Sequence, residues 1–286
     1  VAHSFPTRRS SDLPLISRAD QTNRIDEDTK DFYMTYDKRY EVNGLENHLQ
    51  WGVDHHETDY VREELSQDKR ENSDTESLGV FAANDWSVTK DLVLRLGYRY
   101  NDYEGRYRTD RRRLFGSEKR WVNGDIESRS FSSHAYDTGI VYALSPDLSL
   151  FASYATSFRV PNVDEFAQKA DRLEAQEGTH VDFGGRYTFG GRVEASVTLF
   201  QIRMEDEIYF DEATEVNRNY SEKTRRRGVE SDVKLYLHDA FYLWGNYTYT
   251  EAEFEKSDTT VPLVPEHKAS LGFEWQIDDV VLSLTG

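Results

Sequence analysis

The chain has 286 residues, of which 37% are hydrophobic and 13% aromatic, with a formal net charge of −18 and no cysteine. The negative charge argues against a nucleic-acid-binding protein, which needs a basic surface to neutralise phosphates. The lack of cysteine excludes disulfides and thiolate metal sites. No apolar stretch approaches the ~18 residues of a spanning helix, which excludes a helical membrane protein. A membrane β-barrel is compatible with this composition, because only alternate residues of its strands face lipid.

The two ends of the chain differ from the rest. Residues 1–20 lack the basic start and apolar core of a signal peptide, and residues 4–13 resemble a translated sequencing adapter. We interpret residues 1–20 as a non-native or disordered leader. Residues 21–286 then form one partial β-barrel domain. Because residues 280–286 have the pattern of a strand, we expect a fragment that is cut at both ends.

Alternating polarity dominates the sequence after the leader. Leu92, Leu94 and Leu96, for example, alternate with Arg95 and Gly97. A period of two predicts strands with one apolar and one polar face. Most of the segments exceed the ~5–6 residues of a typical soluble strand and suit the ~9–11 residues of a tilted transmembrane strand. The pattern predicts about twelve strands, over 31–42, 48–63, 76–88, 92–106, 132–144, 148–157, 178–188, 192–204, 224–237, 241–254, 267–277 and 280–286.

The connections between these segments alternate in length. Short turns are predicted at Asn43–Gly44, Thr89–Asp91, Ser145–Asp147, Gly190–Gly191, His238–Asp239 and Asp278–Asp279. Longer polar segments lie at 64–75, 107–131, 158–177, 205–223 and 255–266. Tight periplasmic turns alternating with larger extracellular loops are typical of outer-membrane barrels. The predicted fold is therefore all-β, a transmembrane antiparallel up-and-down β-barrel, here incomplete with about twelve strands.

Four tracts carry a family resemblance. They are Ser153 to Phe166 with the sequence SYATSFRVPNVDEF, Leu173 to Gly178 with LEAQEG, Asn219-Tyr220 followed by Arg227 to Glu230 with RGVE, and Val261 to His267 with VPLVPEH. Their order and spacing resemble TonB-dependent receptors. At Ala175 this sequence departs from the proline that is common in the family. The resemblance covers residues ~130–286 well, and residues ~21–130 match only in the rhythm of strands and loops.

The resemblance implies a 22-stranded barrel of the bacterial outer membrane whose lumen holds an N-terminal plug. It implies an energised receptor that imports a scarce large ligand such as a ferric siderophore, haem or a corrinoid. Partners would be the TonB–ExbB–ExbD complex, acting through a part that precedes this segment, together with outer-membrane lipid and lipopolysaccharide, and no nucleic acid. Inward polar residues such as Arg95, Arg99, Arg186, Glu230 and Lys234 would contact the plug or line the path. The residues that match the family motifs, with a structural role, are Phe158, Arg159, Pro161, Asn162, Glu165, Gly228, Glu230, Pro262 and Pro265.

The arginine-rich segment at 104–129 is the candidate ligand contact. Guanidinium groups suit the carboxylate or catecholate oxygens of an anionic chelate, and aromatic rings could stack on it. Alternatives are a solvated loop with internal ion pairs or a cationic cluster on lipopolysaccharide phosphates. The candidate ligand-binding residues are Tyr107, Arg108, Arg111, Arg112, Arg113 and Trp121.

No metal, cofactor or catalytic site is predicted. His55 and His56 are adjacent in a strand and therefore face opposite sides. The acidic clusters, such as Glu205–Glu207, lack the spacing of a calcium loop. Enzyme motifs are absent. A passive porin-like channel and an adhesive or structural surface barrel remain the alternatives to an importer.

Overall fold

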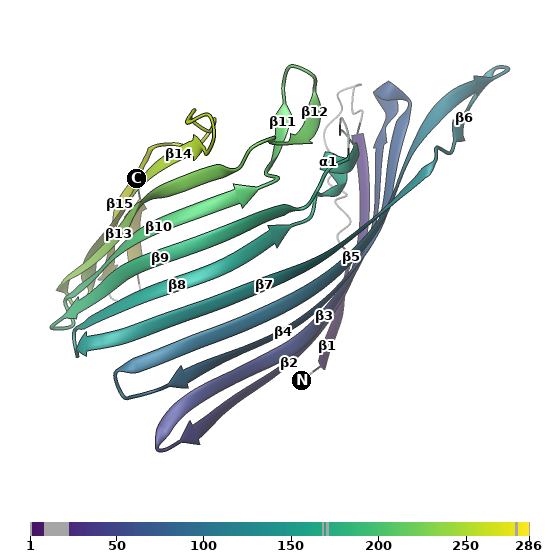
Figure 1. Cartoon of the computed structure of the whole chain (residues 1–286). Helices are drawn as coiled ribbons and strands as arrows, with labels where there is room; N and C mark the ends of the chain where they lie inside the picture. Colours follow the sequence, from purple (N-terminus) through teal and green to yellow (C-terminus); the bar gives the residue numbers. More distant parts are fainter. Residues whose placement is uncertain (1, 9–22, 168, 170–171, 278–279, 286) are drawn as a thin grey trace.

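One large antiparallel sheet makes up most of the molecule (Figure 1). This computed structural model describes residues 2–8, 23–167, 169, 172–277 and 280–285. Fourteen strands form the sheet in the order β1-β2-β3-β4-β5-β7-β8-β9-β10-β13-β14-β15-β16, with β6 paired to β5, and β11 pairs only with β12. Neighbours in the sheet are thus neighbours in sequence, which confirms the predicted up-and-down topology. No helix in the described part of the chain is long and apolar enough to cross a membrane.

Most strands of the sheet are long. The tight turns between consecutive long strands lie at one end of the wall, and a further tight turn at Gly116–Ser117 joins β5 to β6 at the other end. Their bounds are β1 Ala2–Arg8, β2 Asn23–Val42, β3 Leu45–Glu64, β4 Lys69–Ser87, β5 Leu92–Phe115, β6 Glu118–Val122, β7 Ile126–Ser145, β8 Leu148–Arg159, β9 Gln176–Phe189, β10 Val193–Glu205, β11 Ile208–Asp211, β12 Val216–Asn219, β13 Thr224–His238, β14 Phe241–Phe254, β15 His267–Ile277 and β16 Val280–Thr285. The helices are short, η1 at Leu65–Gln67 and α1 at Val163–Ala167. Two of the tight turns, Asn43–Gly44 and Gly190–Gly191, have positive φ at both residues, the conformation that favours two-residue hairpins.

All twelve predicted strands are present, but several continue further than predicted. β2 begins at Asn23, β4 at Lys69, and β5 runs on to Phe115. The predicted loops at 64–75 and 107–131 are therefore wrong in their extent, because most of those residues belong to β3, β4, β5, β6 and β7. Beyond the bilayer both faces of a strand meet water, so the alternation that marks a strand in the sequence disappears there.

At the ends, β1 pairs with β2, and residues 9–22 lie outside the described residues. The assignment of residues 1–20 to a leader and of 21–286 to one domain stays a prediction. The predicted turn at Asp278–Asp279 also lies outside the described residues.

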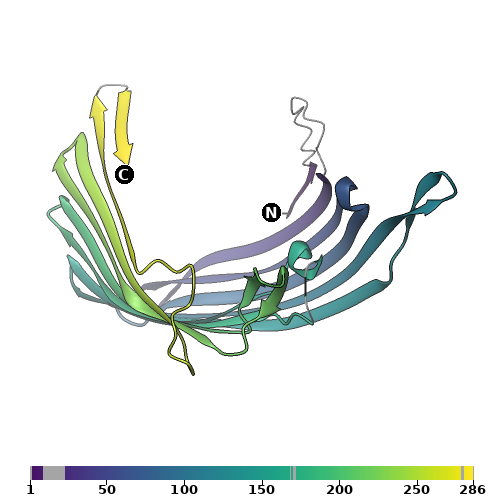
Figure 2. The ribbon, with the colours of Figure 1, turned by 90° about the horizontal axis from the view of Figure 1, so that it is seen from above.

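The sheet is curved and open, with α1 and the β11–β12 hairpin on the inside of the curve (Figure 2). Phe166 of α1 stacks on Tyr107 of β5 at 4.2 Å between ring centroids, which identifies the face of Tyr107 as the concave one. Arg99 and Arg95 share this face by alternation along β5. The register of the neighbouring strands places the residues opposite Arg95 on the same concave face. In order across the sheet these are Gly139, Ser153, Asp182, Phe200 and Gly228.

The opposite, convex face is apolar in the half nearest the tight turns. Its side chains are exposed although large, as expected of a surface that meets lipid rather than water. Examples on neighbouring strands are Leu78, Val80, Leu94, Leu96, Ile140, Val181, Phe183, Val197, Leu199 and Val233. An apolar convex face and a polar concave face are the reverse of a soluble protein's arrangement. They confirm a barrel wall with lipid outside and a polar lumen inside.

Candidate functional site

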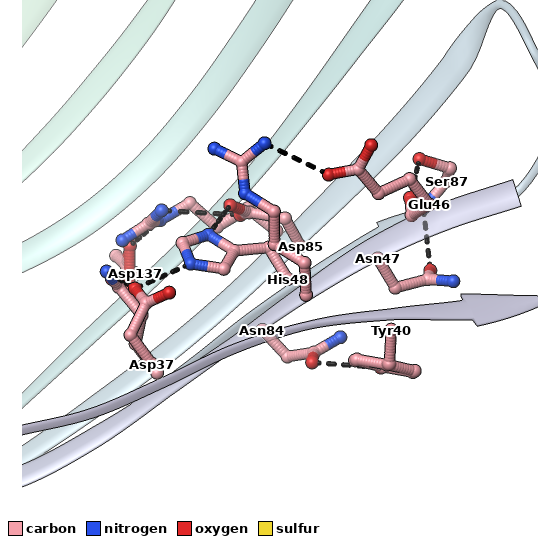
Figure 3. A network of polar contacts seen from close by, with 12 residues as sticks. Asp37, Tyr40, Glu46, Asn47, His48, Asn84, Asp85, Ser87 and Asp137 are labelled. Carbon is pink, nitrogen blue, oxygen red and sulfur yellow. Dashed lines mark hydrogen bonds and ion pairs between the residues drawn. The ribbon is translucent and has the colours of Figure 1, made fainter.

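The concave wall carries a network of charged side chains near the tight-turn end of β2, β3, β4, β5 and β7 (Figure 3). The His48 ring lies between two carboxylates, 2.7 Å from Asp37 and 3.7 Å from Asp85. Arg95 continues the network, with 3.3 Å to Asp85 and 2.8 Å to Asp137. Five strands are thereby joined through their inward side chains.

A second group lies further along the same wall. Arg99 donates to both carboxylate oxygens of Asp54, at 2.7 and 2.8 Å, and to Asn101 at 3.1 Å. His56 contacts the same Asp54 at 3.3 Å and Asp31 at 2.7 Å. Asp54 is buried, so the bidentate arginine supplies the pairing that a buried carboxylate requires.

The other half of the wall contains a groove of about 390 Å³ formed by β9, β10, β13 and β14. Arg186, Glu194 and Lys234 line it. The Lys234 ammonium lies 4.1 Å from the Tyr242 ring centroid, and the Tyr236 hydroxyl donates to Glu194 at 3.1 Å. Glu230 is exposed on the same face. All five polar residues that were predicted from the sequence to face inward therefore lie on the concave face.

The tract after β8 is held in shape by its own side chains. Arg159 donates to both oxygens of Glu165, at 2.9 and 3.0 Å. Glu165 also accepts from the Asn162 amide at 2.8 Å, while the Glu165 amide donates to the Asn162 side chain at 2.8 Å, which is a capping box for α1. Pro161 is fully buried, and Phe158 precedes Arg159 at the end of β8. These motif residues thus form one local unit at the exit from a strand.

This unit positions Phe166 against the wall. Phe166 is 4% exposed and covers Tyr107, whose hydroxyl hydrogen-bonds Tyr103 at 2.8 Å. Burial, together with the Tyr103 hydroxyl, raises the pKa of Tyr107 well above its ordinary value, so the phenol stays neutral. Lys169 pairs with Glu127 of β7 and lies 5.1 Å from the Phe166 ring centroid.

The β11–β12 hairpin is fixed to the same region. The Asn219 side chain accepts from the Glu174 amide at 2.9 Å and donates to the Glu174 carbonyl at 3.2 Å. Glu207, just before β11, accepts from Arg226 at 2.6 Å and from the fully buried Thr224 at 2.6 Å. Two loops that are distant in sequence are therefore anchored on the concave face, at the end opposite the tight turns.

β5 and β6 form a two-stranded ribbon that projects beyond the sheet (Figure 1). At its base Asp110 is completely buried and accepts from Arg70 at 2.8 Å, Arg108 at 2.9 Å, Asn72 at 2.9 Å and the Gly124 amide at 3.2 Å. Burial alone would raise the pKa of Asp110, but Arg70, Gly124, Arg108 and Asn72 outweigh it and lower the pKa. Asp110 therefore stays ionised and ties the ribbon to β4.

The six predicted ligand-binding residues are not brought together. Tyr107 is covered by Phe166, and Arg108 is bound to Asp110. The Trp121 ring lies between Arg70 and Arg112, at 4.7 and 5.1 Å, on the convex side of the ribbon. Arg111 and Arg113 lie on the other side and are exposed. Within the described ranges no carboxylate pairs with either of them.

At the remaining motif positions the structure shows one close backbone approach. A Cβ on Gly228 would lie 1.9 Å from the Tyr249 carbonyl oxygen and 2.8 Å from the Phe200 ring, so no side chain fits there. Pro262 and Pro265 are exposed in the loop after β14, beside Val261, which is 3% exposed and bonds back to Ala252. No group of three or more potential metal ligands occurs among the residues that the structure describes.

Comparison with known proteins agrees with this architecture. A family model described as TonB dependent receptor-like, beta-barrel, matches residues 3–285. The chain belongs to this family of TonB-dependent receptor β-barrels. The family resemblance found in the sequence is thereby confirmed, as is a place in the bacterial outer membrane. This is a family of receptors and transporters rather than of enzymes.

Two curated relatives are similar over most of this chain. An uncharacterized TonB-dependent receptor of Haemophilus influenzae is 25% identical over 217 residues, which cover 71% of this chain and 59% of the relative. The ferripyoverdine receptor of Pseudomonas aeruginosa is 26% identical over 223 residues, 74% of this chain and 25% of the receptor. The chain thus spans less than two thirds of the length of these relatives.

A solved structure supports the fold at the level of the backbone. The closed form of the ferric-catecholate import receptor Fiu from Escherichia coli K12 superimposes with a TM-score of 0.75 at 17% identity. The alignment covers 92% of this chain and 44% of that receptor. At this identity the likeness shows a common fold.

Sequence analysis missed several residues that shape this receptor wall. Asp54, Asp110, Glu207 and Asn219 each bind groups from distant strands or loops. Asn219 stands in one of the four family tracts, and Asp110 left a signal because it alternates with Arg108 and Arg112 in one strand. The partners of Asp54 and Glu207 come from segments far away in sequence, which no local pattern reveals.

Proposed function

We propose that this chain is part of the barrel of an outer-membrane receptor that imports a large, scarce ligand, with energy supplied through TonB. The ligand would be of the class of ferric siderophores, haem or corrinoids. The observation that carries the proposal is the concave wall, which presents paired charges along its length and is partly covered at one end by anchored loops. Such a wall suits both a plug inside the lumen and a polar ligand passing it. The names of the relatives, among them a ferripyoverdine receptor and a ferrichrome outer membrane transporter, support the ligand class.

The ribbon offers the best candidate contact for an anionic ligand. Arg113 lies directly opposite Arg120 in the β5–β6 register, and Arg111 lies on the same side. Arg120 is paired with Glu118, whereas Arg111 and Arg113 have no carboxylate partner among the described residues, so an anionic ligand would be favoured at these two arginines. We therefore keep Arg111 and Arg113 as ligand contacts and assign structural roles to Tyr107, Arg108, Arg112 and Trp121.

We expect that Arg111→Ala combined with Arg113→Ala weakens ligand binding by about tenfold at low salt and less at high salt, because exposed charges are screened. Equilibrium binding of ferric chelates to cells that carry the receptor measures this. The matched control is Arg39→Ala, an exposed arginine paired with Glu46 near the tight turns, which should bind as the wild type does. Equal loss in both variants would contradict a contact at the ribbon.

The importer itself is tested by uptake. The receptor is expressed from its natural gene, sequenced through both ends of this segment, in a strain that lacks its other ferric-chelate receptors. We expect uptake of labelled ferric chelates that stops when TonB is deleted, while surface binding persists. Uptake that survives deletion of TonB would overturn energised import and favour the passive channel. Binding of host or cell surfaces without uptake would favour the adhesive barrel, to which the projecting ribbon would also be suited.

We also propose that the barrel catalyses no reaction and holds no cofactor. Its partners would be the TonB–ExbB–ExbD complex, lipopolysaccharide and the ligand.

A further inference from the structure

Two sets of side chains on the convex face repeat one arrangement. One set is Tyr98 and Tyr100 of β5 with His134 of β7. The other is Tyr247 and Tyr249 of β14 with His267 of β15. In each set the histidine lies directly opposite the second tyrosine. Each histidine Nδ1 is hydrogen-bonded to the hydroxyl of the first tyrosine, at 2.8 Å for Tyr98 and 2.9 Å for Tyr247.

The ring geometry of the two sets is nearly the same. The first tyrosine and the histidine are 6.0 Å apart at 27° in one set and 6.1 Å apart at 26° in the other. The second tyrosine and the histidine are 5.2 Å apart at 46° and 5.3 Å apart at 43°. β8, β9, β10 and β13 separate the two sets in the sheet, so neither set influences the other.

The two sets also stand at the same height in the wall. Counted from Leu92, Tyr98 is the seventh residue of β5, and counted from Phe241, Tyr247 is the seventh of β14. Below them the convex face is apolar, with Leu94 and Leu271 as examples. The next convex-facing residue beyond the tyrosines is a carboxylate in both strands, Asp102 and Glu251. The sets therefore mark the border at which the lipid-facing band ends and the water-facing part begins.

The exposed Nε2 side of each histidine ring suits a hydrogen-bond acceptor in a lipid headgroup. In the tautomer in which the tyrosine hydroxyl donates to Nδ1, the histidine proton is on Nε2, and that N–H is free to donate. The closest carboxylate to His267 Nε2 is Glu266, at 3.9 Å, beyond hydrogen-bond distance. At this height the groups surrounding a barrel are lipid headgroups, and their strongest acceptors are phosphate oxygens.

We propose that the two Tyr–Tyr–His sets bind phosphate groups of the surrounding membrane lipids and so fix the height of the barrel in the bilayer. Tyrosine rings fill the region between acyl chain and headgroup, while histidine Nε2 donates to phosphate oxygen. The occupant is a lipid rather than a soluble anion, because both sets continue the convex apolar surface that lipid covers.

Lipid retention tests this. The receptor, expressed from its natural gene, is placed in bilayers of equal parts phosphatidylglycerol and digalactosyldiacylglycerol, extracted in mild detergent, and its retained lipids are counted by mass spectrometry. We expect the wild type to retain the phospholipid several-fold over the galactolipid. His134→Leu with His267→Leu should lower that preference by at least about twofold, and Tyr98→Phe with Tyr247→Phe should lower it part of the way because the tautomer is no longer fixed.

The control is His238→Leu, which replaces an exposed histidine at the end of β13, beside a tight turn, and should retain the wild-type preference. Heat-modifiable mobility on gels verifies that each variant is folded. If the double variant does not assemble, His134→Leu and His267→Leu are compared singly, and each should lower the preference by about half the effect of the pair. An unchanged preference in the histidine variants, or the absence of any preference in the wild type, would overturn the proposal.

Discussion

Among single residues, Asp110 has the largest expected effect on a local structure. Asp110→Asn removes a buried charge that four donors share, and leaves Arg70 and Arg108 without their carboxylate. Breaking a buried ion pair costs about 3–5 kcal/mol. We expect the ribbon to open more readily, so that trypsin cleaves it at least about a hundredfold faster.

The comparison uses the natural receptor in membranes, with Glu118→Gln as the control. Glu118 is an exposed carboxylate of the same ribbon, and among the described residues it pairs with Arg120 alone. Exposed pairs contribute little to stability, so this variant should be cleaved like the wild type. Equal cleavage of wild type and Asp110→Asn would show that Asp110 does not anchor the ribbon.

The lowered pKa of Asp110 sets a pH window for the same anchor. A carboxyl group whose pKa falls on folding contributes stability above its unfolded value of about 3.9, and this contribution is lost as the pH falls through the folded value. The Gly124 amide, which donates to Asp110, should therefore keep its protection from hydrogen exchange between pH 7 and pH 5 and lose it only below about pH 4. A loss of protection with its midpoint near pH 6 would instead indicate that a histidine, and not Asp110, controls the anchor.

At the scale of elements, the sequence correctly predicted the parts of the strands that cross the bilayer. It did not predict the elements that lie beyond the bilayer. The predicted spans at 241–254 and 267–277 agree with β14 and β15 to the residue. By contrast β6, β11, β12 and α1 were not predicted. They lie in water and are held by contacts such as Asn219 with Glu174, so their sequences carry no apolar periodicity.

Strand packing gives a test in which two glycines are compared. Gly228→Ala in β13 puts a methyl group against the Tyr249 carbonyl and the Phe200 ring. Overpacking of this kind typically costs about 1–3 kcal/mol, so we expect a smaller fraction of folded, heat-modifiable barrel in the outer membrane. Gly245→Ala in β14 is the matched control, because the nearest atom to its Cβ is 3.6 Å away. A drop of equal size in both variants would point to glycine flexibility rather than to the close approach.

Across the whole molecule, the sequence predicts which charged residues face inward but not how they pair. Alternation predicted which residues face inward, and Arg95, Arg99 and Lys234 do lie on the concave face. It could not predict their partners, since Asp54 and Arg99 come from strands that are 45 positions apart in the sequence. Inward direction follows from a local period of two, whereas pairing depends on the register of every intervening strand.

The open sheet leads to a prediction for residues 1–286 expressed alone. Among the residues that the structure describes, β1 and β16 are the two ends of the strand order and are not bonded to each other, so each presents a row of unpaired backbone groups. Such groups cost several kcal/mol each in lipid, which makes an open edge within a bilayer unstable. We expect this segment by itself to aggregate through its edges, without resistance to urea extraction from vesicles and without heat-modifiable mobility. The natural receptor in the same vesicles should show both properties. A monomeric, urea-resistant and heat-modifiable product from residues 1–286 alone would mean that the strands close on themselves, and the open wall would then not be the form that the membrane selects.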